Sequence, residues 1–79
     1  MIKVLFFGPV AERAGTSALE LETSPGLTLG GLRERLTTRY PEAFALVSLM
    51  AVDGRHERDA QRPLEDGAEV VFMSRFSGG

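Results

Sequence analysis

The last two residues, Gly78 and Gly79, carry the most distinctive chemical possibility in the sequence. They follow the strand-like run "AEVVFM", and glycine is the residue least able to hold a fixed conformation. Two residues without side chains can thread a narrow channel in which any Cβ would clash. The reactive group of such a tail is the α-carboxylate of Gly79, which is inert until it is activated. A partner enzyme with ATP could convert it into an acyl adenylate, which a sulfur or amine nucleophile can then attack.

Tail composition alone fits an ordinary frayed terminus equally well. His56 is the only histidine, and beside Arg55 and Glu57 it is typical of a solvated surface residue. The acidic residues are dispersed without metal-ligand spacing, and the serines have no partner base. The absence of cysteine excludes disulfides, a thiolate zinc site and a catalytic thiol. We expect no active site, no metal and no bound cofactor.

Length and charge narrow the class of protein. The chain has 79 residues, enough for one small domain with a thin core. A net charge of −2 and a pI of about 5.3 favour neither nucleic acid nor an anionic membrane as partner. We see no bilayer-spanning run and no signal peptide, and we expect a cytoplasmic protein. Residues 1–73 are predicted to form the domain, and residues 74–79 an extended tail that reaches roughly 20 Å.

The first third of the chain predicts two strands. Residues 1–7, "MIKVLFF", are rich in β-branched and aromatic residues, and both faces of the strand are largely apolar, as expected for a central strand. Residues 11–16, "AERAGT", read as a connecting turn. Residues 17–22, "SALELE", alternate between apolar and charged side chains, which predicts a half-buried strand.

One helix is predicted from Leu29 to Tyr40, with Thr28 as its N-cap. Its apolar stripe consists of Leu29, Leu32, Leu36 and Tyr40. Gly30 and Gly31 in the first turn indicate either a frayed start or close packing against a neighbour. Pro41 ends the helix, and residues 42–47 add at most a short turn.

Three further strands are predicted after this helix. They span residues 48–52, 55–58 and 68–73, and Asp53-Gly54 is a hairpin turn signal between the first two. The element order β-β-α-β-β-β gives an α+β fold in which one helix covers one sheet face. The opposite face then carries Leu5, Phe7, Val71 and Met73, either as scattered surface hydrophobics or as a contiguous interface patch. We favour the patch, since the first and last strands would be neighbours in a closed sheet.

Several segments in the same order resemble the MoaD family, the small subunits of molybdopterin synthase. They are "MIKVLFFGPVAERAG", an "L..L" helix ending at "YP", "MAVDG", "PLEDGAEVVF" and the terminal "SGG". That family belongs with ThiS among the ubiquitin-like sulfur carriers. The resemblance implies a β-grasp fold, in which a mixed sheet of four to five strands packs on one main helix, with a flexible C-terminal Gly-Gly tail.

The resemblance also implies a function and partners. A MoeB-like E1 enzyme would use ATP to adenylate Gly79, and sulfur would then convert it to a thiocarboxylate. The tail, kept slim by Gly78, would enter a MoaE-like large subunit in a heterotetramer and give its sulfur to cyclic pyranopterin monophosphate, which builds the dithiolene of molybdopterin. The chain itself would be a non-catalytic sulfur donor.

A tail that enters another protein needs a docking surface on the domain, because ordering glycines on binding is costly. We predict that this surface is the uncovered sheet face. Its residues would be Leu5, Phe7, Val71 and Met73, with Phe76 at its edge and Arg75 beside it.

The root of the tail departs from the family pattern. Ser74-Arg75 stands where many members carry two prolines, and Phe76 stands where a smaller aliphatic residue is common. The pathway therefore stays open at this point. A carrier for thiamine synthesis, tRNA thiolation or cysteine synthesis, a ubiquitin-like modifier, and an interaction module without tail chemistry are the alternatives.

Overall fold

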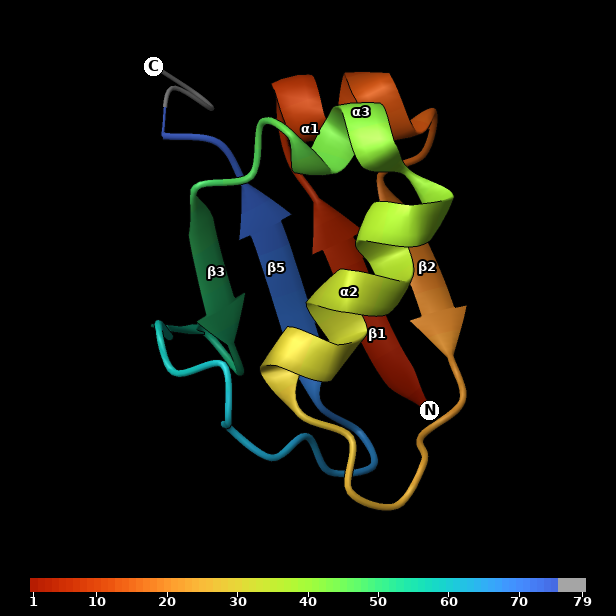
Figure 1. Cartoon of the computed structure of the whole chain (residues 1–79), viewed down its shortest axis with the longest axis vertical. Helices are drawn as coiled ribbons and strands as arrows, with labels where there is room; N and C mark the ends of the chain where they lie inside the picture. Colours follow the sequence, from red (N-terminus) through yellow and green to blue (C-terminus); the bar gives the residue numbers. More distant parts are fainter. Residues whose placement is uncertain (76–79) are drawn as a thin grey trace.

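The computed structural model describes residues 1–75, which form a single sheet with helices packed against one face (Figure 1). The five strands within these residues are β1 (Ile2–Phe6), β2 (Ala18–Leu21), β3 (Leu49–Val52), β4 (Arg55–His56) and β5 (Glu69–Met73). Their order across the sheet is β2-β1-β5-β3-β4. The helices within the same residues are α1 (Pro9–Ala14), α2 (Leu29–Arg39) and α3 (Pro41–Phe44).

The sheet is mixed because its two central strands run parallel. β1 and β5 pair in parallel, with Val4 beside Val70 and Phe6 beside Phe72. The pairs β1–β2, β3–β5 and β3–β4 are antiparallel. The expected neighbourhood of the first and last strands is confirmed, and this arrangement of a mixed sheet around a main helix is the β-grasp, ubiquitin-like fold.

α2 forms where the leucine spacing predicts a helix, and Thr28 caps it. The Thr28 Oγ1 accepts a hydrogen bond from the Gly31 N–H at 3.1 Å, which satisfies one of the free donors of the first turn. The predicted stripe is buried, with Leu36 only 2% exposed, while Tyr40 at its end is half-buried. Opposite it, alternate residues of β1 and β5 complete the core, namely Ile2, Val4, Phe6, Val70 and Phe72.

Two short helices lie where the sequence pattern predicts turns. The turn predicted for residues 11–16 is wrong, because α1 begins at Pro9 and ends just before Gly15. Gly15 has a φ of 75°, the left-handed conformation that is common after a helix. Val10 is buried on this helix. α3 occupies the start of the segment expected as a short turn, and its Phe44 ring lies 4.9 Å from the Phe72 ring, centroid to centroid. The order within residues 1–75 is therefore β-α-β-α-α-β-β-β.

Of the two glycines in the α2 first turn, Gly30 packs closely against a neighbour, which is one of the two interpretations of the sequence. The Gly30 N–H donates to the Ala60 carbonyl at 2.8 Å, and a Cβ on Gly30 would lie 3.0 Å from both the Cβ and the carbonyl oxygen of Ala60. The turn signal at Asp53-Gly54 is also confirmed, since both residues have positive φ, as a tight hairpin turn between β3 and β4 requires.

Candidate functional site

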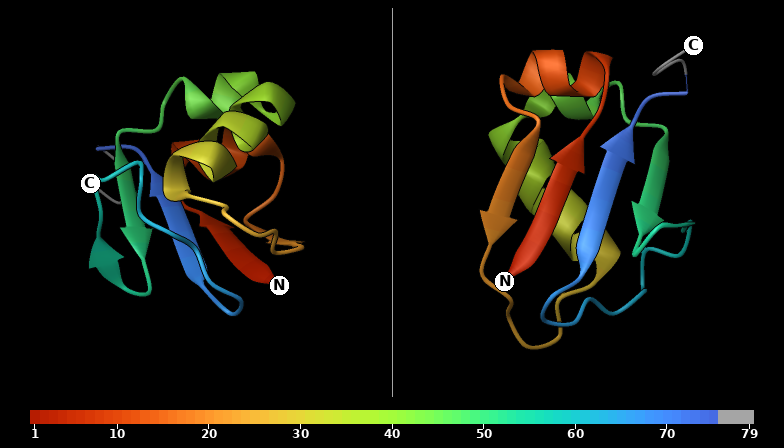
Figure 2. Two further views of the ribbon diagram at one scale, coloured as in Figure 1. Left: turned by 60° about the horizontal axis from the view of Figure 1, so that its bottom comes forward. Right: turned by 180° about the vertical axis from the view of Figure 1, so that it is seen from behind.

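The sheet face away from α2 changes from charged to apolar along the strands, and the strand register shows which residues lie on it. In the view from behind, α2 passes behind the strands and α1 lies beyond their upper ends, so the face is open (Figure 2). Neighbours in register share a face, so a middle row crosses all five strands: Ala18, Leu5, Val71, Ala51 and His56. The row toward the start of β1 is charged, with Glu20, Lys3 and Glu69.

The apolar end of this face lies where β5 finishes. Met73 pairs with Leu49 of β3, and the Phe7 N–H donates to the Phe72 carbonyl at 3.4 Å, which places Phe7 at the same end of β1. The face thus changes from charged to apolar along β5, in the direction in which the chain runs to its tail. We call the four residues Leu5, Phe7, Val71 and Met73 the open-face patch.

The structure brings the four patch residues together, but their exposure differs. Phe7 is 46% exposed and is the side chain of the patch most available to a partner. Leu5 and Met73 are half-buried, whereas Val71 is only 8% exposed. Phe7 is therefore the natural anchor, and Val71 is the floor of the patch.

The tail begins directly beside the patch. The Ser48 N–H donates to the Met73 carbonyl at 3.0 Å, so β5 stays tied to the start of β3 up to its last residue. Ser74 is 8% exposed, and its Oγ has no hydrogen-bond partner among residues 1–75. Arg75 is exposed. Phe76, Gly78 and Gly79, three of the residues singled out from the sequence, lie outside the described residues.

A groove next to the root of the tail joins residues that sequence reasoning did not connect with the site. It encloses about 340 Å³ and is lined by Ser48, Leu49, Met50, His56, Glu57, Arg58 and Arg75. We call it the tail-root groove. The Glu57 N–H donates to the Met50 carbonyl at 2.9 Å, which carries residues 56–58 back along β3 toward Arg75. The Asp53-Gly54 turn signal in the sequence predicts that residues 56–58 run back along β3. That Arg75 lies close to them depends on the position of β5 beside β3 in the sheet.

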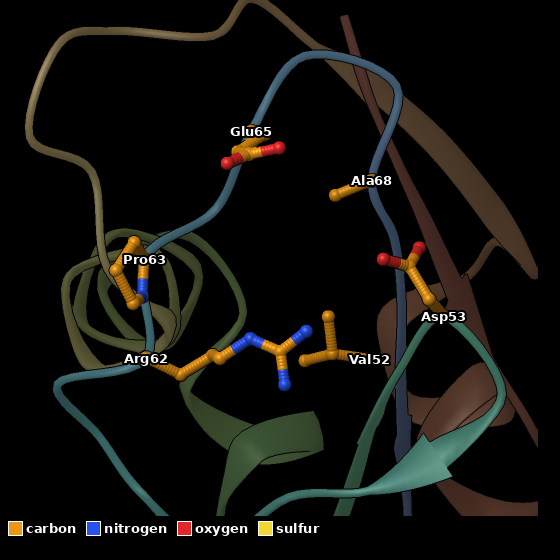
Figure 3. A pocket seen from close by; sticks show the side chains of 6 residues that line it. All are labelled: Val52, Asp53, Arg62, Pro63, Glu65 and Ala68. Atoms are coloured by element: carbon orange, nitrogen blue, oxygen red, sulfur yellow. The ribbon is translucent and has the colours of Figure 1, made fainter.

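A second hollow of about 220 Å³ lies at the other end of β5, before Glu69 (Figure 3). It is lined by Val52, Asp53, Arg62, Pro63, Glu65 and Ala68. Two of its three charged side chains are engaged: the Asp53 carboxylate accepts from the Glu69 N–H at 3.0 Å, and Arg62 pairs with Glu57 at 2.8 Å. The tail leaves from the opposite end of β5, so this hollow is separate from the candidate site.

Two carboxyl groups in the described part of the chain have a lowered pKa, and hydrogen bonds are the main cause in both. The pKa of Glu57 is lowered mainly by the hydrogen bond from Arg62, and the pKa of Asp66 mainly by the hydrogen bond from the N-terminal ammonium group, then by the one from Thr23. His56 is exposed on β4, as expected. Within residues 1–75 no group of His, Asp or Glu side chains has the geometry of a metal site, and no helix is long and apolar enough to cross a membrane.

Comparison with known proteins places this geometry in a family. The model of the ThiS family matches residues 4–79. The molybdopterin synthase sulfur carrier subunit of Escherichia coli strain K12 is 35% identical over 82 residues, and the alignment covers 100% of both chains.

Solved structures share the fold. A putative molybdopterin converting factor subunit 1 from Pyrococcus furiosus superposes with a TM-score of 0.81 at 24% identity, covering 92% of this chain and 94% of that one. A chain of the complex of subunits 1 and 2 of the molybdopterin-converting factor from Helicobacter pylori superposes with a TM-score of 0.71 at 21% identity, covering 99% and 97%. Since the family model matches nearly the whole chain and the E. coli relative aligns from end to end, the protein belongs to the ThiS family.

Proposed function

We propose that this protein is the sulfur-carrier subunit of a molybdopterin synthase. The observation that supports this most is the 35% identity to a molybdopterin synthase sulfur carrier subunit over the full length of both chains. The alignment covers both chains completely and so includes Gly78 and Gly79, the residues that the sequence predicts as the carrier group.

The proposed chemistry takes place at the Gly79 carboxylate in two steps. A carboxylate oxygen attacks the α-phosphate of ATP on an adenylating enzyme, which forms the acyl adenylate and releases pyrophosphate. A sulfide-level sulfur nucleophile then attacks the carbonyl carbon and displaces AMP, which leaves that sulfur on Gly79 as a thiocarboxylate. ATP belongs to the enzyme, and the carrier binds no cofactor of its own.

The second half of the proposal concerns delivery. The tail would enter a MoaE-like large subunit, where the thiocarboxylate sulfur would attack a carbon of cyclic pyranopterin monophosphate. Water would then cleave the acyl–sulfur bond, which leaves the sulfur on the pterin and returns Gly79 to a carboxylate. Two sulfur atoms make one dithiolene, and each carrier brings one, which favours a heterotetramer with two carriers. The protein-protein complex of subunits 1 and 2 of the H. pylori molybdopterin-converting factor supports a partner of this type. The open-face patch would dock on both the adenylating enzyme and the large subunit in turn.

An intact-mass measurement tests the carrier chemistry. The full chain is incubated with the adenylating enzyme, ATP and a sulfur source, and the expected product is heavier by the difference between a sulfur and an oxygen atom. A parallel reaction without ATP is the control. An unchanged mass under conditions in which the E. coli carrier is converted would contradict the proposal.

A second candidate, a ubiquitin-like modifier or a carrier for another thiolation pathway, is favoured by one feature. Ser74-Arg75 and Phe76 replace the residues that are common at the tail entrance of the small subunits, and these positions would contact whichever protein receives the tail. Affinity purification with the tagged chain separates the candidates. Recovery of the large subunit supports the synthase, whereas lysine adducts of Gly79 on other proteins support the modifier.

A further inference from the structure

The tail-root groove carries a local excess of positive charge in a protein that is acidic overall. Arg58 and Arg75 line it, whereas the whole chain has a net charge of −2. Arg58 and Arg75 are exposed, and neither forms an ion pair within residues 1–75. Their guanidinium groups are therefore available to an anion from outside.

The one carboxylate in the groove does not cancel this charge. Glu57 accepts a hydrogen bond from the Arg62 Nη1 at 2.8 Å, so its charge is matched by a residue that does not line the groove. Its second oxygen lies 3.3 Å from the Asp59 N–H, which donates to it. The carboxylate of Asp59 in turn accepts from the Gln61 N–H at 2.9 Å and so holds its own loop.

A further cation stands behind the floor of the groove. Arg33 of α2 places its Nη1 3.9 Å from the Met50 sulfur and donates from Nη2 to the Val47 carbonyl at 3.4 Å. Its bonding partners are neutral, so its positive charge adds to the potential at the groove. The cationic character thus comes from three separate segments, β3–β4 with its following loop, the root of the tail and α2.

The floor of the groove is apolar and continues into the open-face patch. Leu49 and Met50 are half-buried. Leu49 is the register neighbour of Met73, and His56 is the register neighbour of Ala51 in the middle row of the open face. A protein bound to the open-face patch could therefore contact the adjoining groove at the same time.

We propose that the tail-root groove receives an acidic segment of the protein that takes up the tail, with a carboxylate held between Arg58 and Arg75 and an apolar side chain against Leu49. Arginine binds carboxylates through two parallel N–H donors, which fixes orientation as well as adding affinity. The identity of this partner as the tail acceptor rests on the proposed function.

Such an anchor would set how far the tail reaches. Residues 76–79 can extend at most roughly 14 Å beyond Arg75, so a carboxylate fixed at Arg75 limits the positions that Gly79 can occupy in the partner. The same charges would speed encounter with an acidic surface, an effect that salt weakens.

Charge reversal in the full chain tests the groove. Arg58→Glu and Arg75→Glu are compared with Arg13→Glu, which makes the same change at an exposed position on α1. Binding to the adenylating enzyme and to the large subunit is measured by calorimetry at low and high salt, and melting curves establish that each variant is folded. We expect both groove variants to lose about tenfold or more in affinity for at least one partner, with a weaker dependence on salt. Arg13→Glu should bind like the wild type.

Two outcomes would overturn the proposal. The first is unchanged affinity and salt dependence for both partners in Arg58→Glu and Arg75→Glu. The second is occupation of the groove by the chain's own terminal carboxylate, which would appear as altered ring resonances of His56 and guanidinium resonances of Arg58 in the isolated protein when residues 76–79 are removed. We expect those resonances to stay in place.

Failure of the groove proposal is distinguishable from failure of the carrier proposal. The groove proposal alone is refuted if the wild-type chain becomes thiocarboxylated and Arg58→Glu and Arg75→Glu bind the partners as tightly as the wild type. A wild-type chain that neither acquires sulfur nor binds either partner sinks the carrier function, and the groove proposal falls with it.

Discussion

Leu5 lies directly beside Val71 in the parallel pair formed by β1 and β5. This pairing places an apolar row at the centre of the open face and puts Phe7 and Met73 at its end, next to the root of the tail. A partner that holds the tail can therefore contact the patch at the same time, and binding energy from the patch can offset the cost of ordering glycine residues.

Phe7→Ala should weaken binding to both the adenylating enzyme and the large subunit, because the proposed docking patch would serve both. Phe7 is 46% exposed, so truncation should remove contact area with the partner and leave the domain stable. Calorimetry with each partner, alone and in competition, measures the effect. Glu20→Ala, on the charged end of the same face, is the matched control. A stable ternary complex, or unchanged affinity for both partners, would show that the patch is not shared.

Deletion of Gly79, or the substitution Gly78→Ala, should abolish sulfur transfer with almost no change in melting temperature. The buried core within residues 1–75 consists of residues from Ile2 to Phe72, and we expect both variants to keep it. Thiocarboxylate formation and product formation are followed by mass spectrometry, and unfolding by circular dichroism. Native-rate product formation by the Gly79 deletion would refute the carrier mechanism.

Leu36→Ala should destabilise the domain by about 2–5 kcal/mol, the usual range for truncating a buried leucine. Leu36 is 2% exposed and belongs to the stripe of α2 that packs on β1 and β5. Urea denaturation measures the loss, with Glu34→Ala on the exposed side of the same helix as control. A loss no larger than that of the control would mean that the helix contributes little to the core.

Gly30→Ala and Gly31→Ala should change stability in opposite directions. A Cβ at Gly30 would meet Ala60 at 3.0 Å, including a backbone oxygen, whereas the nearest atom to a Cβ at Gly31 is the Thr28 Oγ1 at 3.4 Å. Alanine is otherwise favoured over glycine in a helix by up to about 1 kcal/mol. Thermal melts of the two variants should therefore show a lower midpoint for Gly30→Ala and a higher one for Gly31→Ala. Equal shifts would mean that the loop at Ala60 moves aside without cost.

Asp66→Asn should reduce stability near neutral pH and have a vanishing effect in acid. Hydrogen bonds from the N-terminal ammonium group and from Thr23 hold the pKa of Asp66 below its usual value of 3.8. A carboxyl group with a depressed folded-state pKa contributes stability above its unfolded pKa and loses it as pH falls through the folded one. Urea midpoints of both proteins across that range measure the difference, which should be small because the pair is exposed. A difference that persists at the lowest pH would assign the effect to something other than ionisation.

Much of this fold follows from local patterns in the sequence. The leucine stripe and Thr28 predict α2 because burial and capping act within the same few turns, and the Asp53-Gly54 turn appears as positive φ at both residues. The six-residue helix α1 was missed because it is too short for a periodic stripe, although Pro9 at its start and Gly15 after its end are the flanking residues that helices favour.

The candidate site was only partly predictable. The open-face patch follows from alternation within β1 and β5 once these strands are neighbours, but no local pattern specifies the low exposure of Val71. The tail-root groove joins Arg58 with Arg75 through the order of strands across the sheet. Residues that are brought together by topology leave no spacing signal along the chain.

The position of β5 between β1 and β3 has a consequence for how the protein is made. The ribosome releases β5 after the other four strands, yet the sheet order β2-β1-β5-β3-β4 requires it to join two otherwise separate hairpins. An isolated hairpin is marginally stable in water, and pairing between distant segments slows folding. A nascent chain without β5 therefore cannot assemble its sheet, and folding waits until the segment that leads into the tail has been synthesised. Premature termination would yield an unfolded fragment for proteolysis rather than a folded domain that occupies partners without a usable C-terminus.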